Sequence, residues 1–457
     1  MGNKLLHYIP KDGNIGDCFP LYAKDKYYIY YLKLNDSNQF VWSVAISDDL
    51  INIKEEYDVL LPGEDESLDH TLLSGCVYFE NDTFYAFYSS HGNNGRYNIM
   101  LATSYDGINF KKTNAILFEP NDDYEKLDTW RDPEIFYEDG VYHMLFCAKE
   151  NNVNNTLYSG CVGHATSSDL LTWTLQKPFY SPAIATTLEC PDLFKLDNKY
   201  VLTYYWHDTK YLSANSFNGK YRKNIISSPS NFDFMAAKAL QDQNRTIEFG
   251  WIPRKKCDCA ARDWGGTLAI PKEIYFTDQK TIGCKFIDEV YKYFQNKLNF
   301  SLNVLEGKVT NDKDLTFDSR NKGSIAFVNE PLDNYLLCSN IEVSSSNSQI
   351  IFFIKTECNQ ESNEYTGYQV ILDIGAKKLS IREQYRWDQR PDLSTMPLLI
   401  KNKKFLFEMI VNDDILEINI DKKHCLTYRM LKHQTNSHLG ISVSDGKSIF
   451  KNLNIYK

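Results

Sequence analysis

The stretch MLATSYDGINF, residues 100–110, has two counterparts in the same chain, SVAISDDLINI at 43–53 and GHATSSDLLTW at 163–173. All three fit the pattern Ala-x-Ser-x-Asp-(Leu/Gly)-x-x-(aromatic or Ile), and successive copies begin 57 and 63 residues apart. A repeat of this length holds about four short strands, and radial repetition of four-stranded sheets builds a β-propeller. The three copies therefore favour propeller blades over a sandwich of unrelated hairpins.

Short alternating apolar runs surround these copies, whereas helical periodicity is hard to find. Many runs come in pairs around a polar turn, as at 81–82, 138–140 and 197–198, which is the signal of a β-hairpin. Aromatic residues make up 14% of the chain, and aromatic side chains favour strands. We expect an all-β fold in which five blades begin near residues 17, 74, 132, 190 and 233.

The pattern changes beyond about residue 295, where a new series of alternating strands is separated by turns rich in Ser and Asn. This series is typical of an antiparallel β-sandwich and carries no obvious group of acids. We therefore expect a five-bladed propeller over residues 1–295 that carries the catalysis, followed by a C-terminal β-sandwich over 296–457.

The composition of this 457-residue chain restricts the classes of partner that it is expected to bind. Its formal net charge of −10 argues against nucleic acid and anionic membrane surfaces and fits a neutral small molecule or a sugar as partner. The start of the chain lacks the apolar core of a secretory signal, and the 11 scattered cysteines do not form a disulfide framework. We expect a reduced, cytoplasmic protein; the oligomeric state is not indicated. Cys257 and Cys259 are the only close cysteine pair, with no further ligands nearby, so no metal site is expected.

Three acids stand at the starts of expected first blade strands: Asp17, Asp132 and Glu189. The innermost strands of all blades converge on the central channel, so these carboxyl groups are expected to meet in one pocket. This arrangement suits glycoside hydrolysis, because that reaction needs two carboxyl groups, one ionised and one protonated. In the opening stretch IPKDGNIGDCFP (9–20), Asp12 is followed by Gly and Asn and is typical of a turn.

The same segments resemble glycoside hydrolase family 32, the β-fructosidases (invertases, inulinases and levanases). TWRDPEIF (129–136) resembles the Arg-Asp-Pro motif of that family, and LECPDLF (188–194) resembles its Glu-Cys-Pro-Asp motif. Further similar segments follow in the family's order over nearly the whole chain: VWSVAISDDLINI (41–53), LLSGCVYF (72–79), NFDFMAAKALQD (231–242) and DWGGTLAIPKEI (263–274).

The resemblance implies a five-bladed propeller joined to a β-sandwich, and a retaining mechanism without metal or organic cofactor. It assigns Asp17 as the nucleophile, Glu189 as the general acid/base and Asp132 as the carboxylate that stabilises the transition state. Arg131 is implied to lie near the acid/base or the sugar. The residues implied to line the sugar pocket are Trp42, Ser74, Cys190 and Trp264.

The nucleophile motif diverges from the family pattern. Gly16 replaces the family's Asn, Cys18-Phe19-Pro20 replaces its Pro-Asn-Gly, and Leu32 replaces the Gln that ends the next strand. Amides normally hydrogen-bond the sugar at these places, so recognition of the sugar hydroxyls must differ.

The sequence predicts a retaining hydrolase that releases a terminal fructosyl unit from sucrose or short fructo-oligosaccharides. Alternatives are a fructosyltransferase, a related furanosidase such as an arabinofuranosidase, and a non-catalytic carbohydrate-binding protein. A phosphorylated sugar has only the basic residues of 254–256 and Arg262 in its favour. QYRWDQRP (384–391) is a candidate sugar-binding stretch of the C-terminal domain, although such a domain more often only braces the propeller.

Overall fold

The computed structural model describes residues 6–125, 129–151, 156–223, 231, 233–242, 245–256, 262–278, 280–359, 364–385, 390–400, 403–431 and 437–457. The cysteine pair 257/259 and residues 386–389 of the candidate sugar-binding stretch lie outside these residues. The chain forms two compact units, Met1–Arg254 with Trp264–Glu289, and Lys255–Asp263 with Val290–Lys457. The domain boundary after residue 295 stays a prediction.

The regular secondary structure of the described residues is almost entirely β-strand, as the aromatic-rich alternating pattern predicts. The helical elements among them are the 3-10 turn η1 (Thr156–Tyr158) and the helix α1 (Val290–Tyr293). Within the described ranges, no helix has the length and apolar character needed to cross a membrane.

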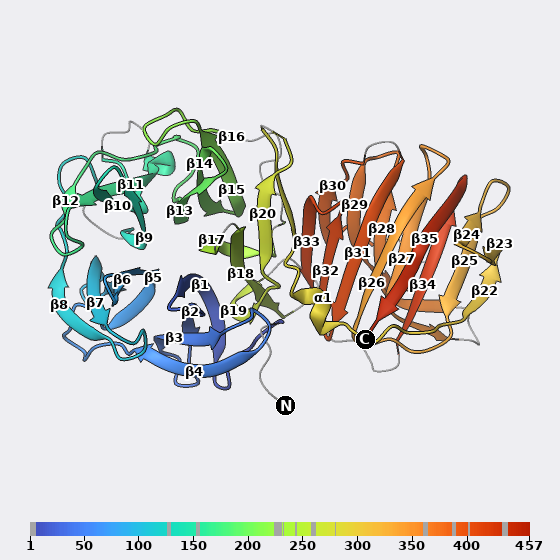
Figure 1. Ribbon diagram of the computed structural model, residues 1–457, viewed down its shortest axis with the longest axis horizontal. Helices are drawn as coiled ribbons and strands as arrows, with labels where there is room; N and C mark the ends of the chain where they lie inside the picture. Colours follow the sequence, from blue (N-terminus) through green and yellow to red (C-terminus); the bar gives the residue numbers. More distant parts are fainter. Residues whose placement is uncertain are drawn as a thin grey trace. The chain divides into compact units, whose positions relative to one another are not determined.

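The first unit is a five-bladed β-propeller (Figure 1). In the first four blades, chain order runs across an antiparallel sheet from the innermost strand outward. Blade 1 is β1 (Asn14–Ala23), β2 (Lys26–Leu34), β3 (Phe40–Ser47) and β4 (Ile53–Leu60); blade 2 is β5 (Thr71–Glu80), β6 (Thr83–His91), β7 (Tyr97–Ser104) and β8 (Lys111–Ile116). Blade 3 is β9 (Arg131–Glu138), β10 (Val141–Lys149), β11 (Gly160–Ser167) and β12 (Thr174–Leu175); blade 4 is β13 (Glu189–Leu196), β14 (Lys199–Trp206), β15 (Asp208–Ala214) and β16 (Arg222–Lys223).

The ring closes through an additional strand. Blade 5 is β17 (Met235–Asp242), β18 (Arg245–Lys255), β20 (Lys272–Phe276) and β21 (Ile282–Phe286), and β19 (Arg262–Leu268) lies between β18 and β1 in one continuous sheet. Ile15 of β1 is paired with Gly266 of β19. The last and first blades are therefore joined by main-chain pairing.

The repeated Ala-x-Ser-x-Asp segments form the turns between the third and fourth strands of blades 1 to 3. In blade 2, Ser104 donates its hydroxyl to Asp106 Oδ1 at 2.7 Å, and the amides of Ile108 and Asn109 donate to the same oxygen at 2.9 and 2.8 Å. The corresponding contacts recur around Asp49 and Asp169. One side chain thus satisfies the backbone amides of each turn.

The next position explains why the repeat alternates between Leu and Gly. Leu50, Gly107 and Leu170 all have positive φ, at 59°, 77° and 66°. The two leucines are buried, so their packing offsets an unfavourable backbone conformation. At Gly107 the hydroxyl of Tyr30 takes that space: it donates to the Gly107 carbonyl at 2.8 Å, and a Cβ would lie 2.9 Å from it.

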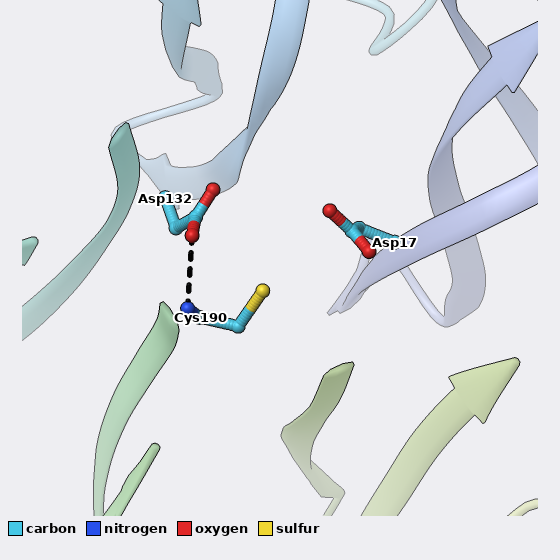
Figure 2. Close-up of side chains that lie close together, drawn as sticks. All are labelled: Asp17, Asp132 and Cys190. Carbon is cyan, nitrogen blue, oxygen red and sulfur yellow. Dashed lines mark hydrogen bonds between the residues drawn. The ribbon is translucent and has the colours of Figure 1, made fainter. Parts of the chain in front are cut away.

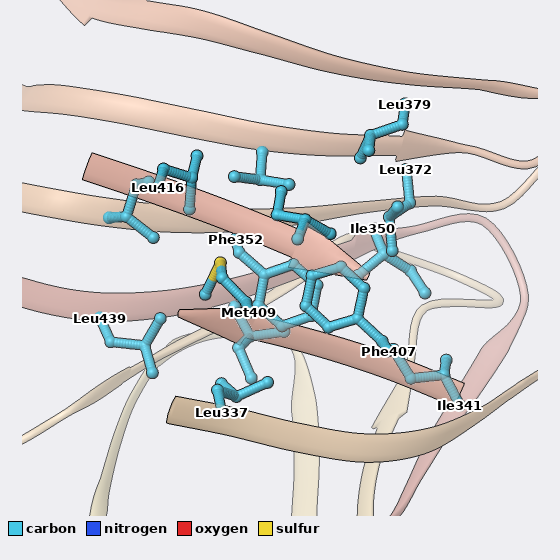
Figure 3. Packing of buried hydrophobic residues seen from close by; sticks show 14 of the residues in the cluster. Leu337, Ile341, Ile350, Phe352, Leu372, Leu379, Phe407, Met409, Leu416 and Leu439 are labelled. Atoms are coloured by element: carbon cyan, nitrogen blue, oxygen red, sulfur yellow. The ribbon is translucent and has the colours of Figure 1, made fainter. Parts of the chain in front are cut away.

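The second unit contains two seven-stranded antiparallel sheets. Their apolar faces form one core, in which the rings of Phe352 and Phe407 stack at 4.5 Å between centroids, one from each sheet (Figure 3). In spatial order, one sheet is β22 (Leu302–Glu306), β25 (Ser324–Val328), β34 (His438–Ser444), β27 (Gln349–Asn359), β28 (Glu364–Asp373), β29 (Lys378–Tyr385) and β30 (Ser394–Pro397). The other is β23 (Lys308–Asn311), β24 (Leu315–Asp318), β35 (Lys447–Tyr456), β26 (Tyr335–Val343), β31 (Lys404–Asn412), β32 (Ile415–Ile420) and β33 (His424–Arg429).

The substitution Asp106→Ala should destabilise the propeller by about 1 kcal/mol near neutral pH, because the turn amides lose their acceptor. Burial opposes ionisation of this side chain, but the hydrogen bonds from Asn109 and Ile108 hold the pKa of Asp106 well below its usual range. A carboxyl with a lowered folded-state pKa stabilises the fold above its unfolded pKa, and that stability is lost as the pH falls. The deficit measured by denaturant unfolding should therefore shrink below about pH 4.

The matched control is Asp36→Ala, which changes an exposed aspartate in another turn of the propeller. It should leave the unfolding free energy nearly unchanged. An equal loss in both variants, or a deficit of Asp106→Ala that grows on acidification, would show that the turn carboxylate is not the stabilising group.

Candidate active site

The innermost strand of every blade carries a β-bulge near its start. In each of these strands, two consecutive residues lie opposite a single residue of the neighbouring strand. The pairs are Gly16–Asp17, Leu73–Ser74, Asp132–Pro133, Cys190–Pro191 and Ala236–Ala237. Bulges bend a strand and redirect its side chains, and they occur often beside active sites. Here they turn one or two side chains of each blade toward the channel.

Three of these bulges share one backbone conformation. Asp132, Cys190 and Ala236 have φ of 59°, 46° and 50°, in the left-handed region that is rare for these residue types. Proline follows the first two, at a position where a strand can accommodate a residue without an amide proton. The Arg-Asp-Pro and Glu-Cys-Pro motifs are therefore one structural feature at two sites in the ring.

Each of the three predicted acids takes a different place relative to the bulge of its own strand. Glu189 precedes it, Asp132 is its first residue and Asp17 its second. All three acids lie near the starts of first strands, as the sequence indicated. Their positions relative to the strand pairing differ from one another by one or two residues, which an alternating pattern cannot show because it does not reveal a bulge.

A cavity of about 310 Å³ lies at this end of the channel. Of the eight residues predicted for the site, seven line it: Asp17, Ser74, Arg131, Asp132, Glu189, Cys190 and Trp264. The lining also includes residues that were not proposed as site residues: Leu32, Phe40, Leu73, Tyr205, Met235, Ala236 and Trp251. Tyr205 pairs with Glu189 across the β13–β14 hairpin, but the bulge at Cys190–Pro191 shifts this pairing by one residue, so counting outward from the turn would have pointed to Trp206 instead.

Trp42 is the predicted site residue that is not part of the lining. Its indole is fully buried, packs against Phe19 at 4.2 Å between ring centroids and donates Nε1–H to the carbonyl of Leu73 at 2.7 Å. Leu73 is a bulge residue of blade 2, so Trp42 supports the wall from behind.

Asp132 is held by donors from both neighbouring blades. Ser74 donates its hydroxyl to Oδ1, and the amide of Cys190 donates to Oδ2 at 2.9 Å (Figure 2). The amide of Asp132 itself donates to Ser89 Oγ at 2.9 Å. With 3% of its surface exposed, Asp132 has little freedom to turn.

Glu189 is more accessible and is paired with Arg131. A guanidinium nitrogen of Arg131 donates to Glu189 Oε1 at 2.6 Å, and Arg131 Nε lies 3.6 Å from Asp132 Oδ2. The Glu189 side chain remains 41% exposed. Arg131 is therefore shared by two of the three acids.

Asp17 faces the Asp132 and Cys190 side of the cavity (Figure 2). Trp251 donates Nε1–H to Asp17 Oδ1 at 3.0 Å. Burial and the charges of Asp132 and Glu189 raise the pKa of Asp17 to about 7, against the opposing hydrogen bonds from Trp251 and Ser74. Asp17 is therefore partly protonated near neutral pH.

Within the described residues, one group of three metal-ligating side chains occurs, and it is in this cavity. One ligand atom each of Asp17, Asp132 and Cys190 lies within 4.8 Å of the others. Asp132 already accepts hydrogen bonds at both oxygens, and burial raises the pKa of the Cys190 thiol, which disfavours the thiolate that metals bind. That the site works without a metal stays a prediction.

These features define a β-propeller protein with three carboxyl groups, a guanidinium and aromatic walls around one cavity. The model of the glycosyl hydrolases family 32 N-terminal domain matches residues 7–284, and the chain belongs to this family. The family resemblance expected from the sequence is thus confirmed.

Two curated relatives come from Escherichia coli. A raffinose invertase is 26% identical over 268 residues, covering 52% of this chain and 54% of the relative. A sucrose-6-phosphate hydrolase is 25% identical over 315 residues, covering 61% of this chain and 63% of the relative. The matched region thus spans between about half and two thirds of the length of these relatives.

Solved structures support the fold over nearly the whole chain. Sucrose-6-phosphate hydrolase from Lactobacillus gasseri matches with a TM-score of 0.75 at 16% identity, covering 98% of this chain and 92% of that one. Exo-inulinase from Aspergillus awamori also gives 0.75, at 18% identity and coverages of 100% and 98%. The predicted five-bladed propeller followed by a β-sandwich is confirmed.

The neutral substitution Asp17→Asn should stabilise the propeller above neutral pH. The folded-state pKa of about 7 lies above the ordinary 3.8, so the stability that Asp17 contributes falls as the pH rises between these values. Asn removes the buried charge and can still accept from Trp251. The melting temperature of the variant should match that of the parent near pH 4 and exceed it by a few degrees at pH 8.

Asp36→Asn serves as the control, since it removes the same charge from an exposed turn. Its melting temperature should follow the parent at both pH values. A melting temperature for Asp17→Asn at or below that of the parent at pH 8 would show that the carboxylate is not destabilised by its surroundings.

Proposed function

We propose that the chain is a retaining glycoside hydrolase of the β-fructosidase type that releases a terminal fructosyl unit from sucrose or short fructo-oligosaccharides. The observation that carries this proposal is that one cavity gathers Asp17, Asp132 and Glu189 from three different blades. Membership of family 32 and relatives named as a raffinose invertase and sucrose-6-phosphate hydrolases support the class of substrate.

The reaction is a double displacement. In the first step Asp17 attacks the anomeric carbon while Glu189 gives its proton to the leaving oxygen, which forms a covalent glycosyl-enzyme. In the second step Glu189 takes a proton from water, and the resulting nucleophile releases the sugar and regenerates the Asp17 carboxylate. No metal ion or organic cofactor takes part in either step.

The first step requires an ionised Asp17 and a proton on Glu189. Trp251 favours the ionised form of Asp17 by donating to it at 3.0 Å. Arg131 donates to Glu189 at 2.6 Å and so orients the carboxyl group that acts as the base in the second step. The cavity therefore supplies a partner for each charged form in the cycle.

Asp132 has a different role, because it is held rigidly by donors from two blades. A fixed carboxylate stabilises the positive charge that develops on the sugar ring in an oxocarbenium-like transition state. Trp264 and Phe40, whose rings meet edge to face at 4.8 Å between centroids, form an apolar wall on which one face of the sugar can rest.

A related furanosidase, such as an arabinofuranosidase, is the second candidate. Leu32 and Leu73 line the cavity with apolar surface, and Leu32 stands where the family resemblance places an amide. A sugar hydroxyl left without a partner in a buried site costs about 1–3 kcal/mol, which is enough to change the preferred glycone.

A panel of sucrose, sucrose 6-phosphate, short fructo-oligosaccharides and aryl arabinofuranosides should separate these functions when products are analysed. Release of free fructose supports hydrolysis, and accumulation of longer oligosaccharides at high substrate concentration indicates fructosyl transfer. Preferred cleavage of the arabinofuranoside favours the second candidate. Binding of a sugar without turnover would contradict both and support a carbohydrate-binding protein.

On the sugar that the enzyme cleaves, substitutions should distinguish the roles of the two reacting carboxyl groups. Asp17→Asn should abolish turnover because no covalent intermediate forms, and Glu189→Gln should lower kcat by about 10²–10⁴-fold because proton transfer is lost. Asp12→Asn is the matched control, since Asp12 lies in the same opening segment but pairs with Lys33 outside the cavity lining. Full activity of Asp17→Asn would remove Asp17 from the mechanism.

The pH dependence follows from the raised pKa of Asp17. The attacking carboxylate must be ionised, so kcat/KM should fall as the pH drops below about 7. The comparison is a pH series for the parent enzyme at substrate concentrations well below KM. A kcat/KM that stays constant down to pH 5 would contradict this assignment of the group that limits the acidic side.

A further inference from the structure

Lys238 is a buried lysine behind the cavity, with 3% of its surface exposed. It lies on β17, directly after the bulge of blade 5. Its ammonium donates to Glu134 Oε2 at 2.7 Å and to the carbonyl oxygen of Pro133 at 3.2 Å. Both acceptors belong to β9 of blade 3, so this side chain links two blades that are not neighbours in the ring.

The link belongs to a set of equivalent positions. Glu134, Asp192 and Lys238 are the residues at which strand pairing resumes after the bulges of blades 3, 4 and 5. Asp192, also buried, accepts the amide proton of Ala239 on β17 at 2.7 Å. The innermost strands β9, β13 and β17 belong to separate sheets, so these side chains connect strands that have no ladder between them.

The acceptor in blade 3 is part of the active-site bulge. Pro133 is the second residue of that bulge, and Asp132 is the first. Lys238 therefore holds the backbone on one side of Asp132, while Ser89 accepts the Asp132 amide on the other. A left-handed backbone at an aspartate persists only when its surroundings fix it.

We propose that Lys238 is a positioning residue for the reaction: by holding the Pro133 carbonyl, it fixes the bulge that aims the Asp132 carboxylate at the sugar. This inference rests on the proposed function for its kinetic consequence, although the structural link does not. A misplacement of about 1 Å in such a group costs about 10²-fold in rate.

A simpler role is charge balance, because removing Lys238 leaves the partly buried Glu134, whose side chain is 21% exposed, without its cation. Breaking one partner of a buried pair is strongly destabilising, whereas replacing both partners by neutral groups is often tolerated. The variant Lys238→Met keeps most of the volume, and the double variant Lys238→Met/Glu134→Gln also removes the unpaired charge. The double variant therefore separates positioning from charge balance.

The double variant should melt close to the parent and still lose about 10²-fold in kcat, with KM changed by less than about threefold. Backbone hydrogen exchange supplies a readout that needs no activity. The amide of Asp132 should exchange at least tenfold faster than in the parent, because its hydrogen bond to Ser89 depends on the fixed bulge.

Lys272→Met is the matched control. Lys272 is also a buried lysine of blade 5, but its ammonium lies over the ring of Phe234 at 3.6 Å. This variant should lose stability without changing kcat per folded molecule or the exchange of the Asp132 amide.

A double variant with parental kcat and parental exchange at Asp132 would overturn the proposal and leave Lys238 as a balancing charge. If the parent cleaves no sugar of the panel, the proposed function fails, and the exchange measurement alone still decides whether Lys238 fixes the bulge. Unchanged exchange in that case rejects the inference as well.

Discussion

In blades 2 to 5 the innermost strand is the edge of its sheet, and an edge strand has backbone groups without a ladder partner. The propeller satisfies many of these groups with side chains from neighbouring blades around the channel. Ser89 accepts the amide of Asp132, Asp132 accepts the amide of Cys190, and Asp192 accepts the amide of Ala239. Asp132 thus belongs both to the cavity and to the contacts between blades, so the geometry of the candidate site and the fold depend on the same hydrogen bonds.

This shared use explains the electrostatic state of the site. Asp132 is buried, and two donors and Arg131 satisfy its carboxyl oxygens. At Asp17, burial and the charges of Asp132 and Glu189 raise the pKa to about 7, against the hydrogen bonds from Trp251 and Ser74.

Much of this arrangement was predictable from short-range patterns. The Ala-x-Ser-x-Asp turns and the hairpins gave the blades, because a turn is built by residues close in sequence. The three acids could be placed at the channel because each lies near the start of the first strand of a blade, and these strands converge on the channel. The site residues Trp264 and Ser74 were reached through the family resemblance, since neither is distinguished by periodicity.

The remainder depends on contacts between blades, which a local pattern does not contain. Trp42 is an aromatic residue of the kind that often contacts sugars, yet its indole donates to the carbonyl of Leu73 and does not line the cavity. Trp251 and Lys238 occur in ordinary strand patterns, and their importance appears only when β18 and β17 are placed opposite β1 and β9. The bulges shift the register after each strand start, so alternation alone could not distinguish Asp132 from its neighbours.

The pairing of Ile15 with Gly266 also has a consequence for how the chain is made. During synthesis, β1 emerges before β19 and cannot gain this second partner until β19 has left the ribosome, some 250 residues later. Until then the first blade exposes a strand edge, and long-range pairing of this kind is slow and favours association between incomplete chains. The edge that closes the ring therefore stays unpaired for much longer than any edge within the hairpins of a blade.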